Sequence, residues 1–326
     1  MTELYPIKFQ PLFKDKIWGG NRIKTSLGMD YDSLPNCGEA WVLSGVEGSQ
    51  TVVANGFLEG NELNELIEIY MGELVGDAVF ERFGNEFPLL IKFIDTNDWL
   101  SIQVHPDDEL AEKRGIGYGK TEMWYILDAE KDSKLISGFR QKVNANVYQQ
   151  HLQNKTLSSI LNYEEVNAGD VFFMPAGRVH AIGPNILLAE IQQTSDTTYR
   201  IYDWDRTDDK GSPRQLHIDQ AMEAIDFEVH DSYKTQYHAV KDATSPIINS
   251  PYFNSQIINL SHAIEKDYSE LDSFVIYICV SGICRIESGE NSLNLRTGET
   301  CLIPADLETV RIFPEKECKL LEVFIL

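Results

Sequence analysis

The chain has 326 residues, a length typical of two domains or of one large all-β unit. Hydrophobic residues make up 43% and charged residues 24%, which excludes a mainly disordered, collagen-like or low-complexity chain. The 51 Asp and Glu residues outnumber the 28 Lys and Arg residues and give a net charge of −23, so we expect no nucleic-acid partner. An anionic ligand would need local cations to hold it against this overall field.

Neither a targeting segment nor a membrane span is visible. The longest apolar run, residues 274–280, is far shorter than the ~20 residues of a membrane helix, and the N-terminus from Met1 to Leu4 lacks the pattern of a signal peptide. An odd number of cysteines without a CxxC pair is typical of free thiols in a reducing compartment. We therefore predict a cytoplasmic protein with no membrane partner and with unreactive thiols at Cys37, Cys279, Cys284, Cys301 and Cys318.

Short β-rich runs, separated by Gly, Asn, Asp and Pro, dominate the first part of the chain. Many such runs at short spacing are typical of a sandwich or barrel. The predicted strands cover residues 89–94, 100–104, 122–127, 170–174 and 186–191.

Helical patterns interrupt these strands as insertions. Residues 62–83 carry apolar side chains at helical rather than alternating spacing. Asp107 and Asp108 follow a proline and are predicted to begin a short helix, where their charges interact favourably with the helix dipole. The predicted helices cover residues 62–83, 107–113, 144–152 and 215–225.

A second strand-rich region follows a charged, turn-rich segment at residues 203–214. Antiparallel hairpins are predicted over residues 274–304. Gly298-Glu299 with Pro304 repeats the pattern of Gly169-Asp170 with Pro175, which describes a turn, an inward-pointing strand and a proline that ends it. Only the first copy continues to a histidine.

The sequence therefore predicts two related barrels, of which only the first can carry a metal. The first domain is expected to span residues 1–239, with helical insertions at about 60–85, 107–116, 144–153 and 215–226. The second, without metal ligands, is expected to span residues 240–326.

Strand alternation places the candidate site residues on common faces. Ser101, Gln103 and His105 share one face of their strand, because successive side chains point to opposite faces. Lys120 and Glu122 share a face in the same way if their segment is extended.

A third segment can bring a second histidine to the same place. The strand at 170–174 ends at a proline, and a glycine turn leads to His180. Together His105, Glu122 and His180 supply two imidazoles and a carboxylate, with Gln103 or a water as a fourth ligand. This set suits Zn²⁺, and also Fe, Mn or Co. The remaining histidines have no surrounding motif and are interpreted as structural: His151, His217, His230, His238 and His262.

These segments match two known signatures. Gly-x5-Pro-x-Gly-x2-His, ending at His180, is the second signature of the cupin superfamily, and Gln103-x-His105 followed by Glu122 is a form of the first. The chain resembles the type I mannose-6-phosphate isomerases, a zinc-dependent cupin family, and in particular their compact bacterial subgroup. The motifs that carry the resemblance lie at residues 16–20, 36–41, 100–108, 119–125 and 193–204.

The resemblance implies a mainly β fold of two cupin-like jelly-roll barrels with a few inserted helices. It is dense over residues 6–215, and the chain departs from the longer members at residues 181–184. It also implies one zinc ion per chain and a specific role for each matched residue: Gln103, His105, Glu122 and His180 as metal ligands, Arg200 as the catalytic residue, and Ser101 and Lys120 as phosphate-binding residues.

The implied reaction interconverts mannose 6-phosphate and fructose 6-phosphate through an enediol-type proton transfer. Its partner is a small-molecule sugar phosphate, and the oligomeric state is left open. The base is undecided among Asp196, Glu39, Lys120 and a metal-bound water. A different interpretation makes Arg200 a surface salt-bridge residue, next to Asp196 and to two further acids, Asp203 and Asp205. The alternative functions are a non-catalytic sugar-phosphate sensor and a metal cupin oxygenase.

Overall fold

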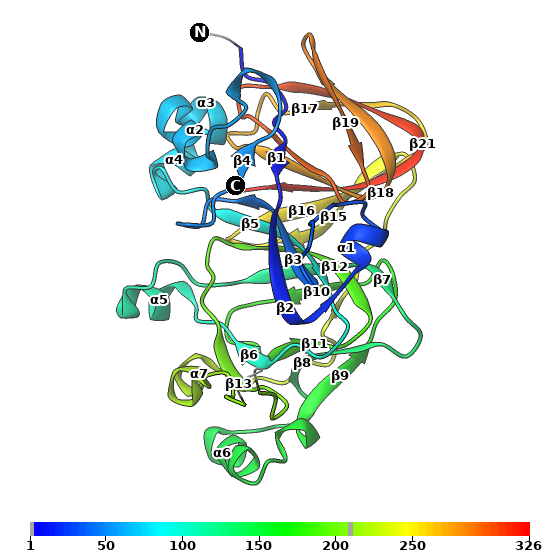
Figure 1. The fold of residues 1–326 in the computed structure, drawn as a ribbon. Coiled ribbons are helices and arrows are strands. Elements are labelled where there is room, and N and C mark those ends of the chain that lie inside the picture. Colours follow the sequence, from blue (N-terminus) through cyan, green and yellow to red (C-terminus); the bar gives the residue numbers. More distant parts are fainter. Residues whose placement is uncertain (1–2, 208–210) are drawn as a thin grey trace.

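The structure is a computed structural model that describes residues 3–207 and 211–326. Residues 1–2, at the predicted leaderless N-terminus, and residues 208–210, within the predicted turn-rich segment, lie outside the described residues. The fold is mainly β with two cupin-like barrels, as predicted from the sequence. Figure 1 shows the C-terminal strands in orange and red above the green strands of the first barrel.

One wall of the first barrel is a seven-stranded sheet with the order β14-β10-β7-β12-β5-β3-β2. Its middle strands β3, β5 and β12 are buried along their whole length, because both faces of the sheet are covered. On β5, Phe93 joins the core shared with the C-terminal region, whereas Ile94 joins the core of the first barrel. The strands are β2 (Leu12–Gly20), β3 (Cys37–Ser44), β5 (Leu89–Asp95), β7 (Glu122–Ala129), β10 (Val171–Met174), β12 (Ile186–Gln193) and β14 (Lys234–Thr235).

The facing wall is a five-stranded sheet with the order β13-β6-β11-β8-β9. In Figure 1 the helices α6 and α7 lie around the lower end of the molecule, beside this sheet, and α5 projects to the left above them. The cavity described below lies between the two walls. The strands are β6 (Ile102–Val104), β8 (Lys134–Phe139), β9 (Leu161–Glu165), β11 (His180–Ile182) and β13 (Tyr199–Tyr202).

The C-terminal sheet is built around two long paired strands, β18 and β21. The sequence predicted antiparallel hairpins over residues 274–304, and within them β18 runs on as one long strand, because bulges around Gly282, which has φ 83°, bend the strand without ending it. The strands are β15 (Ala243–Asn249), β16 (Asn254–Leu260), β17 (Ile264–Asp267), β18 (Val275–Ser288), β19 (Asn291–Arg296), β20 (Thr300–Ile303) and β21 (Thr309–Phe324).

The repeated glycine–proline pattern is confirmed in both barrels. Gly169 and Gly298 have φ angles of 89° and 90°, which favour glycine, and each precedes a four-residue strand, β10 or β20. Each strand ends immediately before a proline. One continuous core nevertheless joins the two regions, as the ring centroids of Phe87 and Phe274 lie 4.7 Å apart. The domain division at residues 239 and 240 therefore stays a prediction.

The predicted helix at 62–83 is wrong in its continuity. The segment forms three short helices, α2 (Leu63–Tyr70), α3 (Gly72–Val75) and α4 (Asp77–Phe83), which break at Met71 with φ 47° and at Gly76 with φ 91°. The breaks turn the chain so that apolar residues of all three helices reach one core. The remaining short elements of this part are β1 (Phe9–Gln10), α1 (Arg22–Thr25), β4 (Val52–Val53) and the 3-10 turn η1 (Gly56–Leu58).

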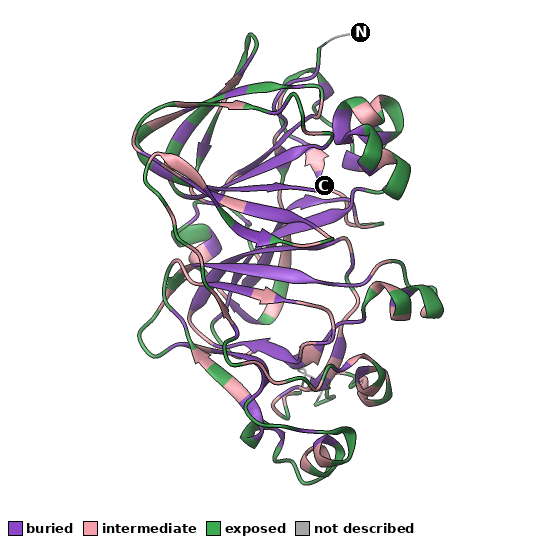
Figure 2. Ribbon diagram, turned by 180° about the vertical axis from the view of Figure 1, so that it is seen from behind, coloured by how far each residue is buried: buried purple, intermediate pink, exposed green. Residues whose placement is uncertain are grey.

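The other predicted helices are present. Asp107 caps α5 (Asp108–Arg114) by accepting from the Leu110 N–H at 2.8 Å, and Asn144 caps α6 (Ala145–Gln153) in the same way; the turn η2 (Leu157–Ser159) follows α6. The last helix, α7 (Ile218–Ala224), begins three residues later than predicted. Among the described residues, no helix is long and apolar enough to cross a membrane. Figure 2 shows that burial concentrates in the strands and exposure in the helices and loops.

Candidate active site

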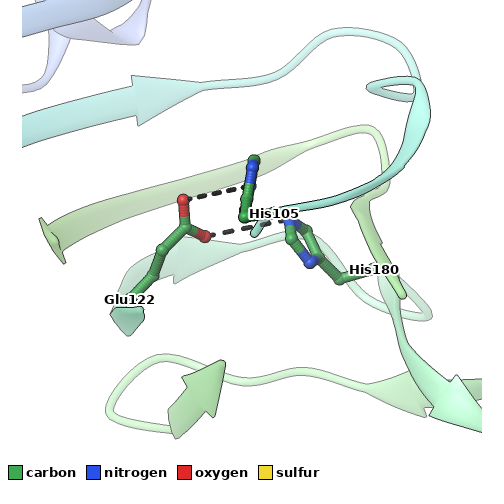
Figure 3. Close-up of side chains that lie close together, drawn as sticks. All are labelled: His105, Glu122 and His180. Atoms are coloured by element: carbon green, nitrogen blue, oxygen red, sulfur yellow. Dashed lines mark ion pairs between the residues drawn. The ribbon is translucent and has the colours of Figure 1, made fainter. Parts of the chain in front are cut away.

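Three buried side chains from three strands meet in the first barrel. His105 follows β6, Glu122 begins β7 and His180 begins β11. The Nε2 atom of His105 lies 3.3 Å from Oε1 of Glu122, and Nε2 of His180 lies 3.8 Å from Oε2 of the same carboxylate (Figure 3). The sequence prediction that these residues converge is therefore confirmed. The turn before His180 is tied to the site, because the Gly177 N–H donates to the His105 carbonyl at 2.9 Å.

Backbone carbonyls fix the tautomer of both histidines. Nδ1 of His105 lies 2.8 Å from the Thr197 carbonyl, and Nδ1 of His180 lies 2.8 Å from the Arg178 carbonyl. A carbonyl oxygen can only accept, so each Nδ1 carries the proton and each Nε2 keeps its lone pair. Both lone pairs are turned toward Glu122, which is the arrangement of histidines that bind a metal through Nε2.

Protonation states in the cluster also suit a metal. Burial lowers the pKa of His105 to about 3 and lowers that of His180, so both rings are neutral. Burial alone would raise the pKa of Glu122, but the Lys120 cation, with Nζ 3.5 Å from Oε1, lowers it and favours the ionised carboxylate. Neutral imidazoles and a carboxylate are the forms that bind divalent cations.

Two of these ligand atoms lack partners inside the protein. Among the described residues, His105 Nε2 and Glu122 Oε2 are buried and accept or donate no hydrogen bond. A buried polar atom without a partner costs about 1–3 kcal/mol, so the arrangement is costly unless something else binds there. The donor set, its burial and these two atoms fit a divalent metal ion.

Gln103 lies beside the trio, opposite His180 on the neighbouring strand. Its amide nitrogen lies 3.3 Å from His180 Nε2, while its amide oxygen accepts from the Ser101 hydroxyl at 3.4 Å. Binding a metal through oxygen would need the two ends of the amide to change places. Its role as a fourth ligand stays a prediction.

A cavity of about 290 Å³ opens next to the trio. The predicted residues Ser101, Gln103, Lys120, Glu122 and Arg200 all line it. Although the whole chain carries a charge of −23, the cavity presents five cations against four carboxylates. The cations are Lys16, Lys92, Lys120, Arg200 and Arg214, and the carboxylates are Glu39, Glu122, Glu190 and Asp196.

Lys120 and Ser101 occupy the buried end of this cavity. Lys120 is only 4% exposed and Ser101 only 3%. The Lys120 Nζ atom lies 3.5 Å from Glu122 Oε1. The Lys120 segment is fixed by its neighbours: its backbone N–H donates to the Pro106 carbonyl at 3.0 Å, and Asp108 accepts from the Gly119 N–H at 2.8 Å. Alternation therefore placed Lys120 correctly, beside Glu122 and away from solvent.

Arg200 is not a salt-bridge residue in the described part of the chain. The acid that could have paired with it, Asp203, instead accepts from Arg206 at 2.6 Å and from Arg214 at 2.5 and 2.7 Å. The Arg200 guanidinium donates from Nη1 to the Gln215 carbonyl at 2.9 Å, and its Nε is buried without a partner. Burial and the Arg214 cation lower its pKa. Among the described residues, none of the acids of the salt-bridge interpretation, Asp196, Asp203 and Asp205, forms an ion pair with Arg200.

Sequence analysis missed Lys92 and Glu190, which belong to a row of charged and aromatic residues on the seven-stranded sheet. In register, Trp124, Glu190, Lys92 and Trp41 lie side by side on β7, β12, β5 and β3. Lys92 Nζ lies 3.2 Å from Glu190 Oε1, and the Trp124 indole N–H donates to the other Glu190 oxygen at 2.8 Å. A lysine and a glutamate in the middle of apolar strand runs were the signal that could have revealed them.

Glu39 is held by three groups. Its carboxylate accepts from the Trp41 indole at 2.7 Å and lies 3.1 Å from Lys16 and 3.9 Å from Lys92. Burial alone would raise its pKa, but the two lysines lower it to about 2. Burial, followed by the charge of Glu122, raises the pKa of Glu190. Two carboxyls of one cavity thus have their pKa values moved in opposite directions.

Comparison with known proteins found one family of relatives that matches most of the chain. Residues 7–137 match the family model of the phosphomannose isomerase type I catalytic domain, and residues 243–324 match that of the mannose-6-phosphate isomerase cupin domain. The chain is 35% identical to the mannose-6-phosphate isomerase ManA of Bacillus subtilis over 96% of its own length and 97% of that protein's. It is 33% identical to a mannose-6-phosphate isomerase of Streptococcus mutans, with 93% and 94% covered. The crystal structure of a Bacillus subtilis mannose 6-phosphate isomerase superposes with a TM-score of 0.88 at 30% identity, covering 98% of this chain and 99% of that one.

Proposed function

Because this chain belongs to the type I mannose-6-phosphate isomerases, we propose that it interconverts mannose 6-phosphate and fructose 6-phosphate in the cavity beside His105, Glu122 and His180. The observation that carries the proposal is the combination, in one cavity, of a metal-ligand trio with an arginine that has no carboxylate partner among the described residues. The surplus of cations along the cavity suits a sugar phosphate, which is a dianion at neutral pH.

The trio would hold one divalent ion, for which zinc is our preferred identity, with Gln103 as a further ligand. When bound, such an ion would act as a Lewis acid on a sugar oxygen. Two imidazoles and one carboxylate are donor types that catalytic zinc sites use. The chain's own residues supply the remaining requirements.

An aldose–ketose isomerisation moves a proton between C2 and C1 through an enediol-type intermediate. Arg200 would stabilise the negative charge that develops on the sugar oxygens, because its guanidinium stays cationic and offers several donors in one plane. Lys120 and Ser101 would hold the phosphate from the buried end of the cavity. The Arg214 guanidinium, fixed on Asp203, adds a further cation at the rim.

The cavity lining and the pKa shifts bear on the choice of the acid–base residue. Glu39 is a poor base, because two lysines and an indole hold its oxygens and its pKa is about 2. Glu190 joins the candidates, since it lines the cavity and its pKa is raised. Asp196 lines the same cavity and is exposed, and Lys120 also remains a candidate.

The test is an isomerase assay of the purified protein, with and without a chelator, in both directions. We expect conversion of mannose 6-phosphate to fructose 6-phosphate that is lost on chelation and restored by one equivalent of zinc. A protein that binds the sugar phosphate but does not convert it would favour the sensor alternative. Oxygen consumption in place of isomerisation would favour the oxygenase.

A further inference from the structure

Residues 215–217, which directly precede α7, contact both the backbone and the side chain of Arg200, and we call this segment the clasp. The sequence analysis had assigned its histidine, His217, to a structural role. Strand β13 is an edge strand of its sheet, because β6 is its only partner among the described strands. At Arg200 the open edge is covered by His217. The Arg200 backbone N–H donates to His217 Nδ1 at 3.1 Å, and the His217 backbone N–H donates to the Arg200 carbonyl at 2.7 Å.

These two hydrogen bonds replace, at Arg200, the backbone hydrogen bonds that a neighbouring strand would make. A backbone donor and a backbone acceptor of Arg200 are both satisfied by the same residue, once through its side chain and once through its main chain. A third bond reaches the arginine head, since Nη1 donates to the Gln215 carbonyl at 2.9 Å. The clasp, residues 215–217, therefore fixes both the backbone and the guanidinium.

The clasp is itself anchored on both sides. Before it, Arg214 is held by two hydrogen bonds to Asp203. After it, α7 begins at Ile218 and packs Ala221, which is fully buried, into the same core as β6 and β13. Because His217 lies between these two anchored segments, its position is restrained, and its hydrogen bonds restrain Arg200 in turn.

The bond from the Arg200 N–H constrains the chemistry of His217. Nδ1 can accept only if it carries a lone pair, so the ring is neutral with its proton on Nε2. Burial and the neighbouring Arg200 cation lower the pKa of His217, which favours this neutral form. The ring also lies beside Tyr199, with centroids 6.4 Å apart, so a ring of similar size would fill the same space.

We infer that His217 is a positioning residue for the isomerisation: its Nδ1 acceptor and its backbone N–H hold Arg200 where the guanidinium can meet the charge that develops on the substrate. This inference rests on the proposed function. His217 does not line the cavity, so it acts through Arg200 and not on the sugar. A misplacement of about 1 Å at a charged catalytic group can cost about 10²-fold in rate.

The experiment compares two replacements of the same side chain. His217→Phe keeps a ring and removes the acceptor, whereas His217→Asn places an amide oxygen near the position of Nδ1. We expect His217→Phe to lower kcat by about 10- to 100-fold with KM almost unchanged, and His217→Asn to restore most of the loss. His238→Phe, at an exposed histidine, is the matched control and should behave like the wild type.

A further comparison separates positioning from general damage. In an Arg200→Ala background, His217→Phe should cause no additional loss of kcat, because the residue through which it acts is already gone. Thermal unfolding and metal content of each variant show whether the fold and the metal site are intact.

Three outcomes would overturn the inference alone: an unchanged kcat in His217→Phe, an equal loss in His217→Asn, or losses that add in the Arg200→Ala background. A wild-type protein without isomerase activity would instead contradict the proposed function and remove the inference with it. An Arg200→Ala variant with full activity would overturn the inference and leave the proposed function standing, so the wild-type assay distinguishes the two failures.

Discussion

Lys92 and Glu190 lie opposite each other on β5 and β12, with Nζ 3.2 Å from Oε1, and both residues are at least 95% buried. Glu39 and the Trp124 indole complete their surroundings. Burial alone would lower the pKa of Lys92, but the carboxylates of Glu190 and Glu39 raise it, so the lysine stays charged. Burying two charges inside a barrel wall costs desolvation free energy, which is offset only if the two groups pair with each other.

Removing one member of this pair should therefore strongly destabilise the protein. We expect Lys92→Met to lower the free energy of unfolding by about 3–5 kcal/mol, because it leaves Glu190 buried without its cation. The double variant Lys92→Met/Glu190→Leu should recover much of this loss. Urea unfolding of the metal-free proteins measures the effect. Lys24→Met, at an exposed ion pair with Asp30, is the control and should change little. Equal stability of the wild type and Lys92→Met would contradict the argument.

The Lys92–Glu190 pair also shows where sequence reasoning succeeds and where it stops. His105, Glu122 and His180 could be predicted, because strand alternation and fixed spacing act locally and decide which way each side chain points. Lys92 and Glu190 became partners only through the register of β5 on β12, which joins residues almost a hundred positions apart. Local patterns do not encode such a register.

Sequence analysis missed the breaks within the helical segment 62–83 and the clasp at residues 215–217 for similar reasons. The apolar spacing of residues 62–83 predicted one helix correctly in type, but the break at Met71 has a positive φ in a non-glycine residue, which no local preference announces. His217 carries no motif, and its contact with Arg200 depends on where α7 docks against β13. Tertiary packing, and not local preference, decides both features.

Metal binding is the prediction that the trio supports most directly. We expect the wild type to hold one tightly bound divalent ion per chain, and His105→Ala and His180→Ala each to lose most of it. Elemental analysis after exhaustive dialysis measures the content. Asp226→Asn serves as a control, because Asp226, Glu228 and His230 form a second, more exposed group that we expect not to retain a metal on dialysis. Full occupancy in both histidine variants would exclude the trio as the metal site.

The C-terminal barrel is predicted to hold no metal. Among the described residues, neither group of potential metal ligands lies within residues 243–324. Inside this barrel, Tyr268 bonds to both Tyr277 and Glu322, and Lys266 Nζ lies 3.0 Å from Glu322, so the buried carboxylate already has its partners. Glu322→Gln should therefore leave the metal content at one per chain. A second equivalent that disappears in this variant would contradict the prediction.

Glu39 should make stability depend on pH in the acid range. Its pKa is about 2 in the folded protein and about 4.3 in an unfolded chain, so unfolding takes up a proton at pH values between the two. This contribution to stability is fully present above the unfolded value and is lost as the pH falls toward 2. We expect the stability of Glu39→Gln to fall less steeply than that of the wild type over this range. Urea unfolding in the presence of a chelator measures both slopes without a contribution from metal loss, and parallel curves would contradict the assignment.

Arg200 and Lys120 should differ in the kinetic constant that they affect. If Arg200 stabilises the developing enediolate, its charge matters more in the transition state than in the ground state, so Arg200→Ala should lower kcat by about 10²–10³-fold and change KM less. Arg200→Lys should recover only part of the loss, since lysine lacks the planar pair of donors. Lys120→Ala should mainly raise KM if Lys120 holds the phosphate.

The measurement is steady-state kinetics with mannose 6-phosphate, together with metal analysis of each variant. Arg200 is not a ligand of the trio, and its Nη1 is bound by the Gln215 carbonyl, so the metal content of Arg200→Ala should stay unchanged. For Lys120 the metal analysis also serves as a control, because Nζ lies 3.5 Å from Glu122 and its removal can alter the carboxylate. A near-normal kcat in the Arg200→Ala enzyme would show that Arg200, despite its buried and unpartnered Nε, acts outside catalysis.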